Sequence, residues 1–113
     1  MLGNTQSFTK IRLIKEFTMM NINKRPVMAK EKFGSELLWR QEDDKHILLA
    51  RHDMYILNAF SREILDLCDG TRTVKDIIDY VVSKYSVTDD EATNQFSNFF
   101  NYTMEKQLLT LED

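Results

Sequence analysis

The chain has 113 residues, of which 42% are hydrophobic and 29% are charged, as is usual for a single globular domain. Its net charge of −3 at pH 7 disfavours nucleic-acid binding, because most of that affinity comes from basic side chains on phosphates. No apolar run reaches the roughly 18 residues that a membrane span requires, and the first 20 residues lack a secretory signal pattern. One cysteine permits no internal disulfide. We therefore expect a cytoplasmic protein.

The first 24 residues are expected to form a poorly ordered N-terminal tail. Within this stretch Ile11, Ile14 and Phe17 have the spacing of one helical face, so a short basic amphipathic helix is the alternative. From residue 25 the chain changes character, because Pro26 fixes φ and favours extended geometry in the residue before it. The sequence therefore predicts a tail over residues 1–24 and a domain over residues 25–113.

Three strands are predicted in the first half of the domain. Large side chains over residues 35–40, an almost continuous apolar run over 46–50 and a third apolar run over 54–57 are typical of strands. A charged loop over residues 41–45 and the short connection 51–53 join them. Connections this short force an antiparallel meander, since parallel neighbours need a long crossover. The third strand then lies at an edge of the sheet.

The first helix is predicted to follow directly. Asn58 is a suitable N-cap because its short side chain accepts hydrogen bonds from free backbone N–H groups, and Asp69-Gly70 ends the helix because Gly adopts the left-handed conformation readily. The residues with helical spacing along the apolar face are Ile56, Phe60, Ile64 and Leu67.

Two more helices complete the predicted fold. Thr73 with Asp76, and Thr88 with Glu91, have the spacing of capping boxes, and the last helix is expected to run to about Gln107. The sequence therefore predicts an α+β fold of winged-helix type, in which a three-stranded antiparallel sheet is followed by three helices.

No residue pattern indicates catalysis. Cys68 has apolar neighbours and is expected to be a buried structural thiol, while His46 and His52 are isolated and expected to face solvent. The acidic residues 42–44 lack the spacing and the Gly of a calcium loop, and the chain has no Gly-rich phosphate loop. We therefore expect no enzyme activity, no metal and no cofactor.

The third strand is the feature that indicates a function. Soluble proteins usually protect an edge strand with Lys, Pro or a bulge, whereas only Asp53 precedes this one. An extended peptide can add to such an edge through backbone hydrogen bonds. Candidate peptide-binding residues on the strand are Asp53, Met54, Tyr55, Ile56 and Leu57. Candidates on the last helix, which share a narrow stripe at helical spacing, are Gln95, Phe99, Tyr102 and Lys106.

Other interpretations of these residues stay open at this point. Phe99 is equally well explained as a core residue, and Tyr102 as a surface residue. An exposed edge also allows two copies of the chain to pair as a homodimer. The main alternative function is a winged-helix DNA-binding regulator, which the acidic start of the last helix, Asp89-Asp90-Glu91, disfavours.

A short motif in the middle of the chain carries a family resemblance. It reads Leu57-Asn58, then Ile64-Leu65-x-Leu67-Cys68-Asp69-Gly70-x-Arg72-Thr73-Val74 with a following Ile77. This order resembles the signature of the PqqD family, which comprises pyrroloquinoline quinone synthesis protein D and related domains that recognise ribosomally made precursor peptides. The resemblance extends from about Arg25 to Leu109.

The resemblance implies a role in peptide delivery. In the family, the leader segment of the precursor pairs with the third strand and lies against the last helix. The domain presents the peptide to a modifying enzyme, a radical S-adenosylmethionine enzyme in the quinone pathway, and performs no chemistry itself. By position, residues 53–57 match the pairing strand and residues 95–106 match the wall. The chain departs from the family at Gln107, where Gly is frequent, and at residues 51–53, where quinone members often have Pro-Glu-Gly.

Overall fold

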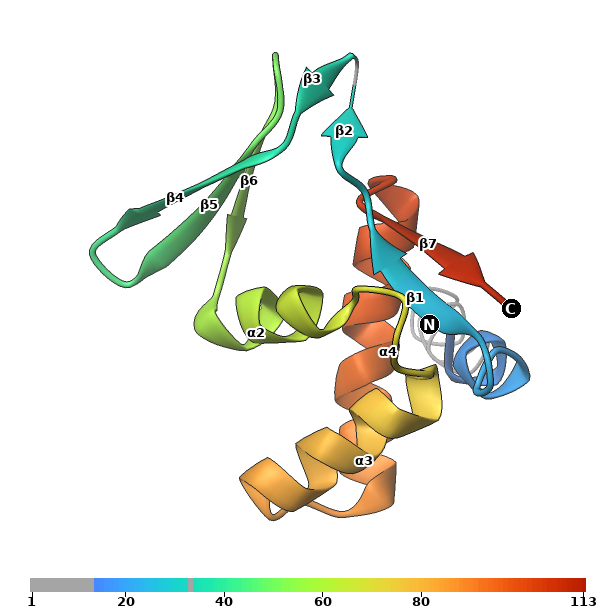
Figure 1. Ribbon diagram of the computed structural model, residues 1–113. Coiled ribbons are helices and arrows are strands. Elements are labelled where there is room, and N and C mark those ends of the chain that lie inside the picture. The colour runs from blue at the N-terminus through green and yellow to red at the C-terminus, as the bar shows by residue number, and fades with distance from the viewer. Residues whose placement is uncertain (1–13, 33) are drawn as a thin grey trace, which may run out of the picture.

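The computed structural model describes residues 14–32 and 34–113. Residues 14–20 form a helix that precedes the labelled elements of Figure 1. No helix within these described ranges is long and apolar enough to cross a membrane. The labelled elements, in chain order, are β1 (Arg25–Met28), β2 (Glu31–Lys32), β3 (Ser35–Glu36), β4 (Leu38–Glu42), β5 (Lys45–Leu49), β6 (Met54–Leu57), α2 (Ala59–Leu67), α3 (Val74–Tyr85), α4 (Asp89–Glu105) and β7 (Leu109–Glu112).

The predicted three-stranded antiparallel sheet is present, in the order β4-β5-β6. β6 has the predicted bounds, whereas β4 covers residues 38–42 instead of 35–40. The predicted charged loop over residues 41–45 shrinks to a turn of two residues. Glu42 lies directly opposite Lys45, and an oppositely charged cross-strand pair stabilises the ladder up to the turn.

The sheet has a covered inner face and an open outer face. Trp39, Leu48 and Tyr55 lie opposite one another along the ladder and therefore share a face, which is the inner one, since Leu48 is fully buried in the core. The helix α2 lies on this side of the sheet (Figure 1), and the guanidinium of Arg62 lies 4.1 Å from the centre of the Trp39 ring. The inner face and the three helices thus enclose one core.

The first helix after the sheet begins as predicted. The side chain of Asn58 accepts a hydrogen bond from the backbone N–H of Ser61 at 2.8 Å, which satisfies one of the unpaired donors at the start of α2. The predicted apolar stripe is correct at Ile64, which is fully buried. It is wrong at Ile56, which belongs to β6 and is 55% exposed, while the neighbouring Leu57 is buried.

The later helix starts also follow the capping pattern. The N–H of Thr73 donates to the carboxylate of Asp76 at 3.0 Å, and the N–H of Asp76 donates back to the Thr73 hydroxyl at 3.1 Å. The bond from the Thr73 backbone lowers the pKa of Asp76. Of the second predicted capping box the structure shows the N-cap bond, in which the Thr88 hydroxyl accepts from the N–H of Glu91 at 3.1 Å. The helix α4 ends two residues before the predicted Gln107, which has a positive φ of 60°, a conformation that favours Gly.

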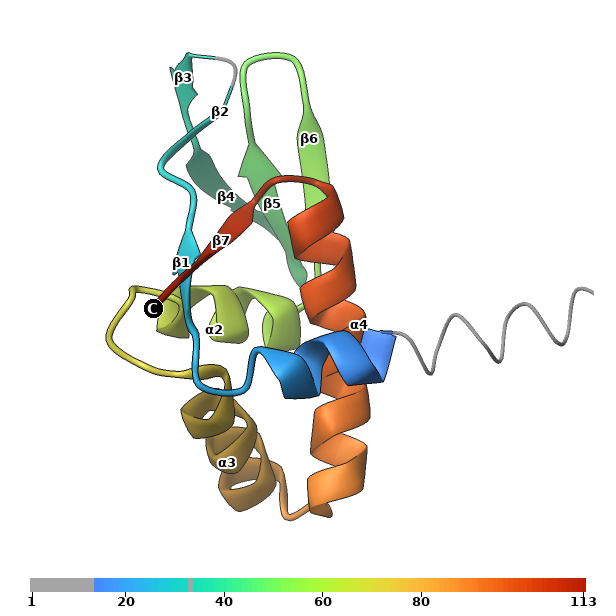
Figure 2. The ribbon, with the colours of Figure 1, turned by 90° about the vertical axis from the view of Figure 1, so that its right-hand side faces the viewer.

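A second small sheet was not predicted. β1 pairs antiparallel with β7, and Val27 lies opposite Thr110. Figures 1 and 2 show that this two-stranded ribbon brings the two ends of the folded domain together beside α2 and α4. Gly70 lies close beneath it, because a Cβ there would meet the Val27 side chain at 3.2 Å. The pair is about 80 residues apart in sequence, so no local pattern indicates it.

The helix of residues 14–20 packs against α4 (Figure 2). The Ser97 hydroxyl donates to the Thr18 hydroxyl at 2.8 Å, and both residues are buried. The rings of Phe17 and Phe100 stack with their centres 5.5 Å apart. These contacts cross the predicted domain boundary at residue 24 and differ from the expected tail. The helix of residues 14–20 corresponds instead to part of the amphipathic alternative, of which Ile11 lies outside the described residues.

Candidate functional site

The free edge of the sheet is the backbone of β6, which pairs only with β5. The turn before it fixes the hydrogen-bonding pattern, because Ala50 and Asp53 exchange both backbone bonds, at 2.9 and 3.2 Å. Bonded and non-bonded pairs alternate along an antiparallel ladder. Tyr55 and Leu57 therefore direct their N–H and C=O groups toward β5, whereas Met54 and Ile56 direct theirs toward the open edge.

The outward groups of the β6 edge have no partner strand within the described part of the chain. No backbone bond beyond those of the ladder involves Met54 or Ile56. Their side chains are also accessible, at 60% and 55% exposed. Unpaired groups on an apolar strand are a template for pairing with another extended chain.

A groove of about 710 Å³ lies beside the end of β6. It is formed where the start of α2, the end of α3 and one face of α4 converge. The residues that line it are Asn58, Phe60, Ser61, Tyr85, Val87, Gln95, Asn98, Phe99 and Tyr102. Its lining therefore combines four aromatic side chains with uncharged amide and hydroxyl groups, a composition suited to peptide side chains and backbone.

The predicted site residues divide between these two features. Gln95, Phe99 and Tyr102 line the groove, and Phe99 is only 7% exposed, so it belongs to the core as well. Lys106 does not line the groove; it caps α4, and its ammonium lies 6.0 Å from the centre of the Tyr102 ring. None of the predicted strand residues 53–57 lines the groove, and β6 reaches it through Asn58, the residue that follows the strand.

At one end of the site, Lys32 connects β6 to the end of α4. Sequence reasoning missed this residue. Its ammonium donates to the Tyr55 hydroxyl on β6 and to the backbone carbonyl of Lys106 at the end of α4. The Tyr55 hydroxyl in turn donates to the carboxylate of Asp53 at 3.2 Å. This chain of polar contacts connects the edge strand to the helix that faces it.

The other end of the site is held by Glu63, which sequence reasoning also missed. Its carboxylate accepts hydrogen bonds from the hydroxyls of Tyr85, at 2.5 Å, and Tyr80, at 2.9 Å, and forms an ion pair with Lys84. The Tyr85 ring packs edge-on against Phe60 with centres 5.7 Å apart. Glu63 thus fixes one aromatic wall of the groove. Only the tertiary fold brings α2 and the end of α3 together, so the sequence alone carried no signal for this cluster.

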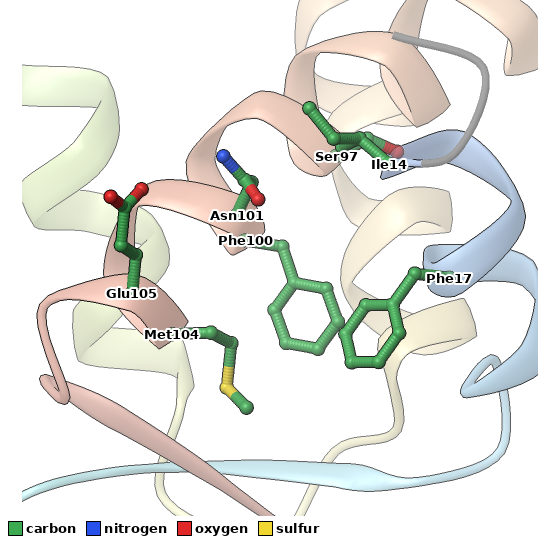
Figure 3. Close-up of a pocket in the computed structure, with 7 residues that line it drawn as sticks. All are labelled: Ile14, Phe17, Ser97, Phe100, Asn101, Met104 and Glu105. Atoms are coloured by element: carbon green, nitrogen blue, oxygen red, sulfur yellow. The ribbon is translucent and has the colours of Figure 1, made fainter. Parts of the chain in front are cut away.

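A second hollow, of about 490 Å³, lies on a different face of α4 (Figure 3). The close-up shows the Phe17 and Phe100 rings next to each other near the Met104 side chain, with Asn101 and Glu105 on the same helix as Phe100. No strand residue lines this hollow, which lies where the helix of residues 14–20 meets α4. It shares no lining residue with the groove beside β6.

The single cysteine of the chain, Cys68, is buried. Burial raises the pKa of the Cys68 thiol to about 12, and the nearby charge of Asp69 contributes to the increase, so the thiol stays protonated and unreactive at neutral pH. No group of three or more His, Cys, Asp or Glu side chains within residues 14–32 and 34–113 is placed to hold a metal ion.

The family assignment rests on a comparison with known proteins. A family model for coenzyme PQQ synthesis protein D (PqqD) matches residues 45–109, more than half of the chain. The chain belongs to the PqqD family. The matched part of this PqqD-family chain contains β5, β6 and the three labelled helices, and therefore both the open edge and the groove. No curated protein sequence matches the chain significantly.

A solved structure has the same fold as this PqqD-family chain. It is TbiB1 in complex with the TbiA(beta) leader peptide. The two chains superpose with a TM-score of 0.59 and 20% sequence identity, over 74% of this chain and 93% of TbiB1. At this identity the similarity shows that the fold is shared.

Proposed function

We propose that this protein captures the leader segment of a ribosomally made precursor peptide and presents it to a modifying enzyme. The leader adds to β6 as a fourth strand of the sheet, and its inward side chains enter the groove against α4. The observation that carries this proposal is the pair of outward-facing backbone groups on Met54 and Ile56, beside an aromatic groove. Membership of the PqqD family and the fold shared with a protein solved in complex with a leader peptide support it.

The geometry of the site suits strand addition. An incoming strand places successive side chains on opposite faces, so those that share a face with Tyr55 and Leu57 point toward the groove. There they meet Phe99 and Tyr102, while Lys106 is placed to meet an acidic residue further along the peptide. Backbone bonds supply affinity independent of sequence, and the groove supplies the choice between sequences.

The protein acts in this proposal as a carrier, and the partner enzyme performs the chemistry. The family resemblance implies this division, and the buried thiol of Cys68 takes no part in the proposal. A radical S-adenosylmethionine enzyme is the partner that the family resemblance points to. Pairing of two β6 edges in a homodimer would compete with the peptide for the same backbone groups.

The direct test is isothermal titration calorimetry with synthetic peptides tiled across the leader of a precursor peptide encoded beside this gene. We expect one leader segment to bind with a dissociation constant of about 1 μM or tighter, which corresponds to about 8 kcal/mol. Peptides from the core of the same precursor serve as controls and are expected not to bind. Binding of core and leader segments with equal affinity, or of neither, would contradict the proposal.

A further inference from the structure

The outer face of the sheet carries apolar side chains that the proposed role of the groove does not explain. Leu38, Met54 and Ile56 are each more than half exposed. Leu38 and Met54 both lie opposite Leu49, on neighbouring strands, so the three share the outer face. Ile47, opposite Ile56, is buried but stands outside the main core cluster. These residues form a separate apolar surface.

No labelled helix covers this surface. α2 lies on the inner side of the sheet, and α3 and α4 lie beyond it (Figure 1). The surface ends at β6, where Met54 and Ile56 are the same two residues whose backbone groups face the open edge. The apolar side chains and the unpaired backbone groups therefore belong to one continuous feature, which we call the β6 edge.

A strand that pairs with the β6 edge places side chains on both faces of the sheet. Those opposite Tyr55 face the groove, and those opposite Met54 and Ile56 lie on the outer face. Side chains directly opposite each other on an antiparallel pair are about 5 Å apart at their Cβ atoms and interact. The peptide residues between the groove-facing ones would thus cover Met54 and Ile56.

We infer that the protein recognises its peptide on both faces of the added strand. The inference rests on the proposed function and names the class of peptide: a short, β-prone run with apolar side chains at consecutive positions. A peptide that alternates apolar and polar residues would fill the groove and leave Met54 and Ile56 in water. The bound peptide, and not a separate protein, is the occupant, because the apolar side chains are carried by the pairing residues themselves.

The experiment begins with a phage-displayed library of random peptides of about twelve residues, roughly twice a typical strand. Peptides are selected on the full-length protein, and the selection is repeated on the Ile56→Thr variant. Threonine keeps the β-branched shape that suits a strand and removes the apolar contact. We expect wild-type selection to enrich runs with apolar residues at consecutive positions, and the variant to accept polar residues at every second position.

A double-mutant cycle then measures the contact. Ile56→Thr is expected to weaken an enriched peptide by about fivefold, within the range for one cross-strand pair, and to have no effect once the facing peptide residue is itself Thr. Leu38→Thr is the matched control, because Leu38 has the same exposure and lies on the outer face at the opposite edge. Met54→Thr repeats the test at the second outward position and replaces Ile56→Thr if that variant does not fold.

Two results would overturn the inference while leaving the proposed function intact. One is enrichment of peptides with polar residues at every second position on the wild-type protein. The other is an equal loss of peptide affinity for Ile56→Thr and Leu38→Thr. The absence of any enriched peptide, or binding that survives a proline at Ile56, would instead contradict the proposed strand addition itself.

Discussion

The two edges of the three-stranded sheet differ in almost everything except hydrogen-bonding geometry. Since His46 and Leu48 direct their backbone bonds toward β6, the alternation along β5 leaves Trp39 and Gln41 with outward groups on β4. β4 reads Leu-Trp-Arg-Gln-Glu, whereas β6 reads Met-Tyr-Ile-Leu.

Only the β6 edge is linked to α4, whereas Trp39 on β4 lines a hollow with residues of β1 and α2. β4 carries the ion pair of Arg40 with Glu42, the kind of charge that discourages strand pairing, and it lines no groove that includes α4. β6 has neither Lys nor Pro and is linked to α4 through Lys32. In the proposed function the two edges differ because only β6 combines unpaired backbone groups with an apolar strand and a link to α4.

The comparison is tested most severely by placing proline at each edge. We expect Ile56→Pro to weaken leader binding by more than about tenfold, because proline removes the N–H that the peptide bonds and its ring projects into the incoming strand. Gln41→Pro is the matched control, since it alters an outward, exposed position on β4, and is expected to change affinity less than about twofold. Calorimetry measures both, and thermal unfolding checks that both variants fold. Equal losses at the two edges would remove the distinction between them.

The α4 side of the groove is tested by shortening Tyr102, which is more exposed than Phe99 on the same helix. Tyr102→Ala is expected to weaken leader binding by about fivefold to tenfold, within the range for loss of a buried aromatic contact. The free energy of unfolding should fall by less than about 1 kcal/mol, because Tyr102 is 37% exposed in the free protein. Asn94→Ala is the control, as an exposed α4 residue outside the groove. If the Tyr102→Ala variant bound the leader with unchanged affinity, the proposed contact between the peptide and α4 would be contradicted.

The support of the groove from α2 and α3 is tested at Glu63. Glu63→Gln keeps an oxygen that accepts from Tyr85 but removes the charge that pairs with Lys84, so we expect leader affinity to fall by about threefold. Asp66→Asn is the control, because Asp66 also forms an ion pair from α2, with Arg62, away from the groove. Fluorescence titration of a labelled leader peptide measures both. A larger loss for Asp66→Asn would contradict the role of Glu63.

The smallest expected effect on leader binding concerns the contact between α4 and the helix of residues 14–20. Ser97→Ala removes the buried bond to Thr18, and we expect it to lower the free energy of unfolding by about 1 kcal/mol while leader affinity changes less than about twofold. Ser83→Ala is the control, on an exposed position of α3. Urea denaturation measures the difference. If Ser97→Ala were as stable as the wild type, residues 14–20 would behave as the tail that the sequence predicted.

Local patterns were sufficient for much of the fold. The apolar runs around β5 and β6, the capping residues Asn58 and Thr73, and the turn at Gly70 act within a few residues of one another, so they predict the sheet order and the helix starts. The β1–β7 ribbon escaped prediction because its two strands meet only after the core between them has formed.

The same limit applies to the site. The free edge followed from the meander, and the stripe of Gln95, Phe99 and Tyr102 followed from helical spacing. The contributions of Tyr85 and Glu63 could not be predicted in this way, since only the tertiary fold brings α2 and the end of α3 together. Ile56 was assigned to the helix stripe because its spacing from Phe60 fits a helix. The strand β6 in fact continues to Leu57, and the side chain of Ile56 lies on the outer face of the sheet.

The most direct test of the account is amide hydrogen exchange, measured by NMR on the free protein and on the protein saturated with its leader segment. Exchange of the Met54 and Ile56 amides is predicted to be fast in the free protein and to slow by at least about tenfold on binding. The outward amides of Trp39 and Gln41 are predicted to exchange at unchanged rates. Unchanged exchange at Met54 and Ile56, in a sample where the peptide is bound, would contradict strand addition at β6.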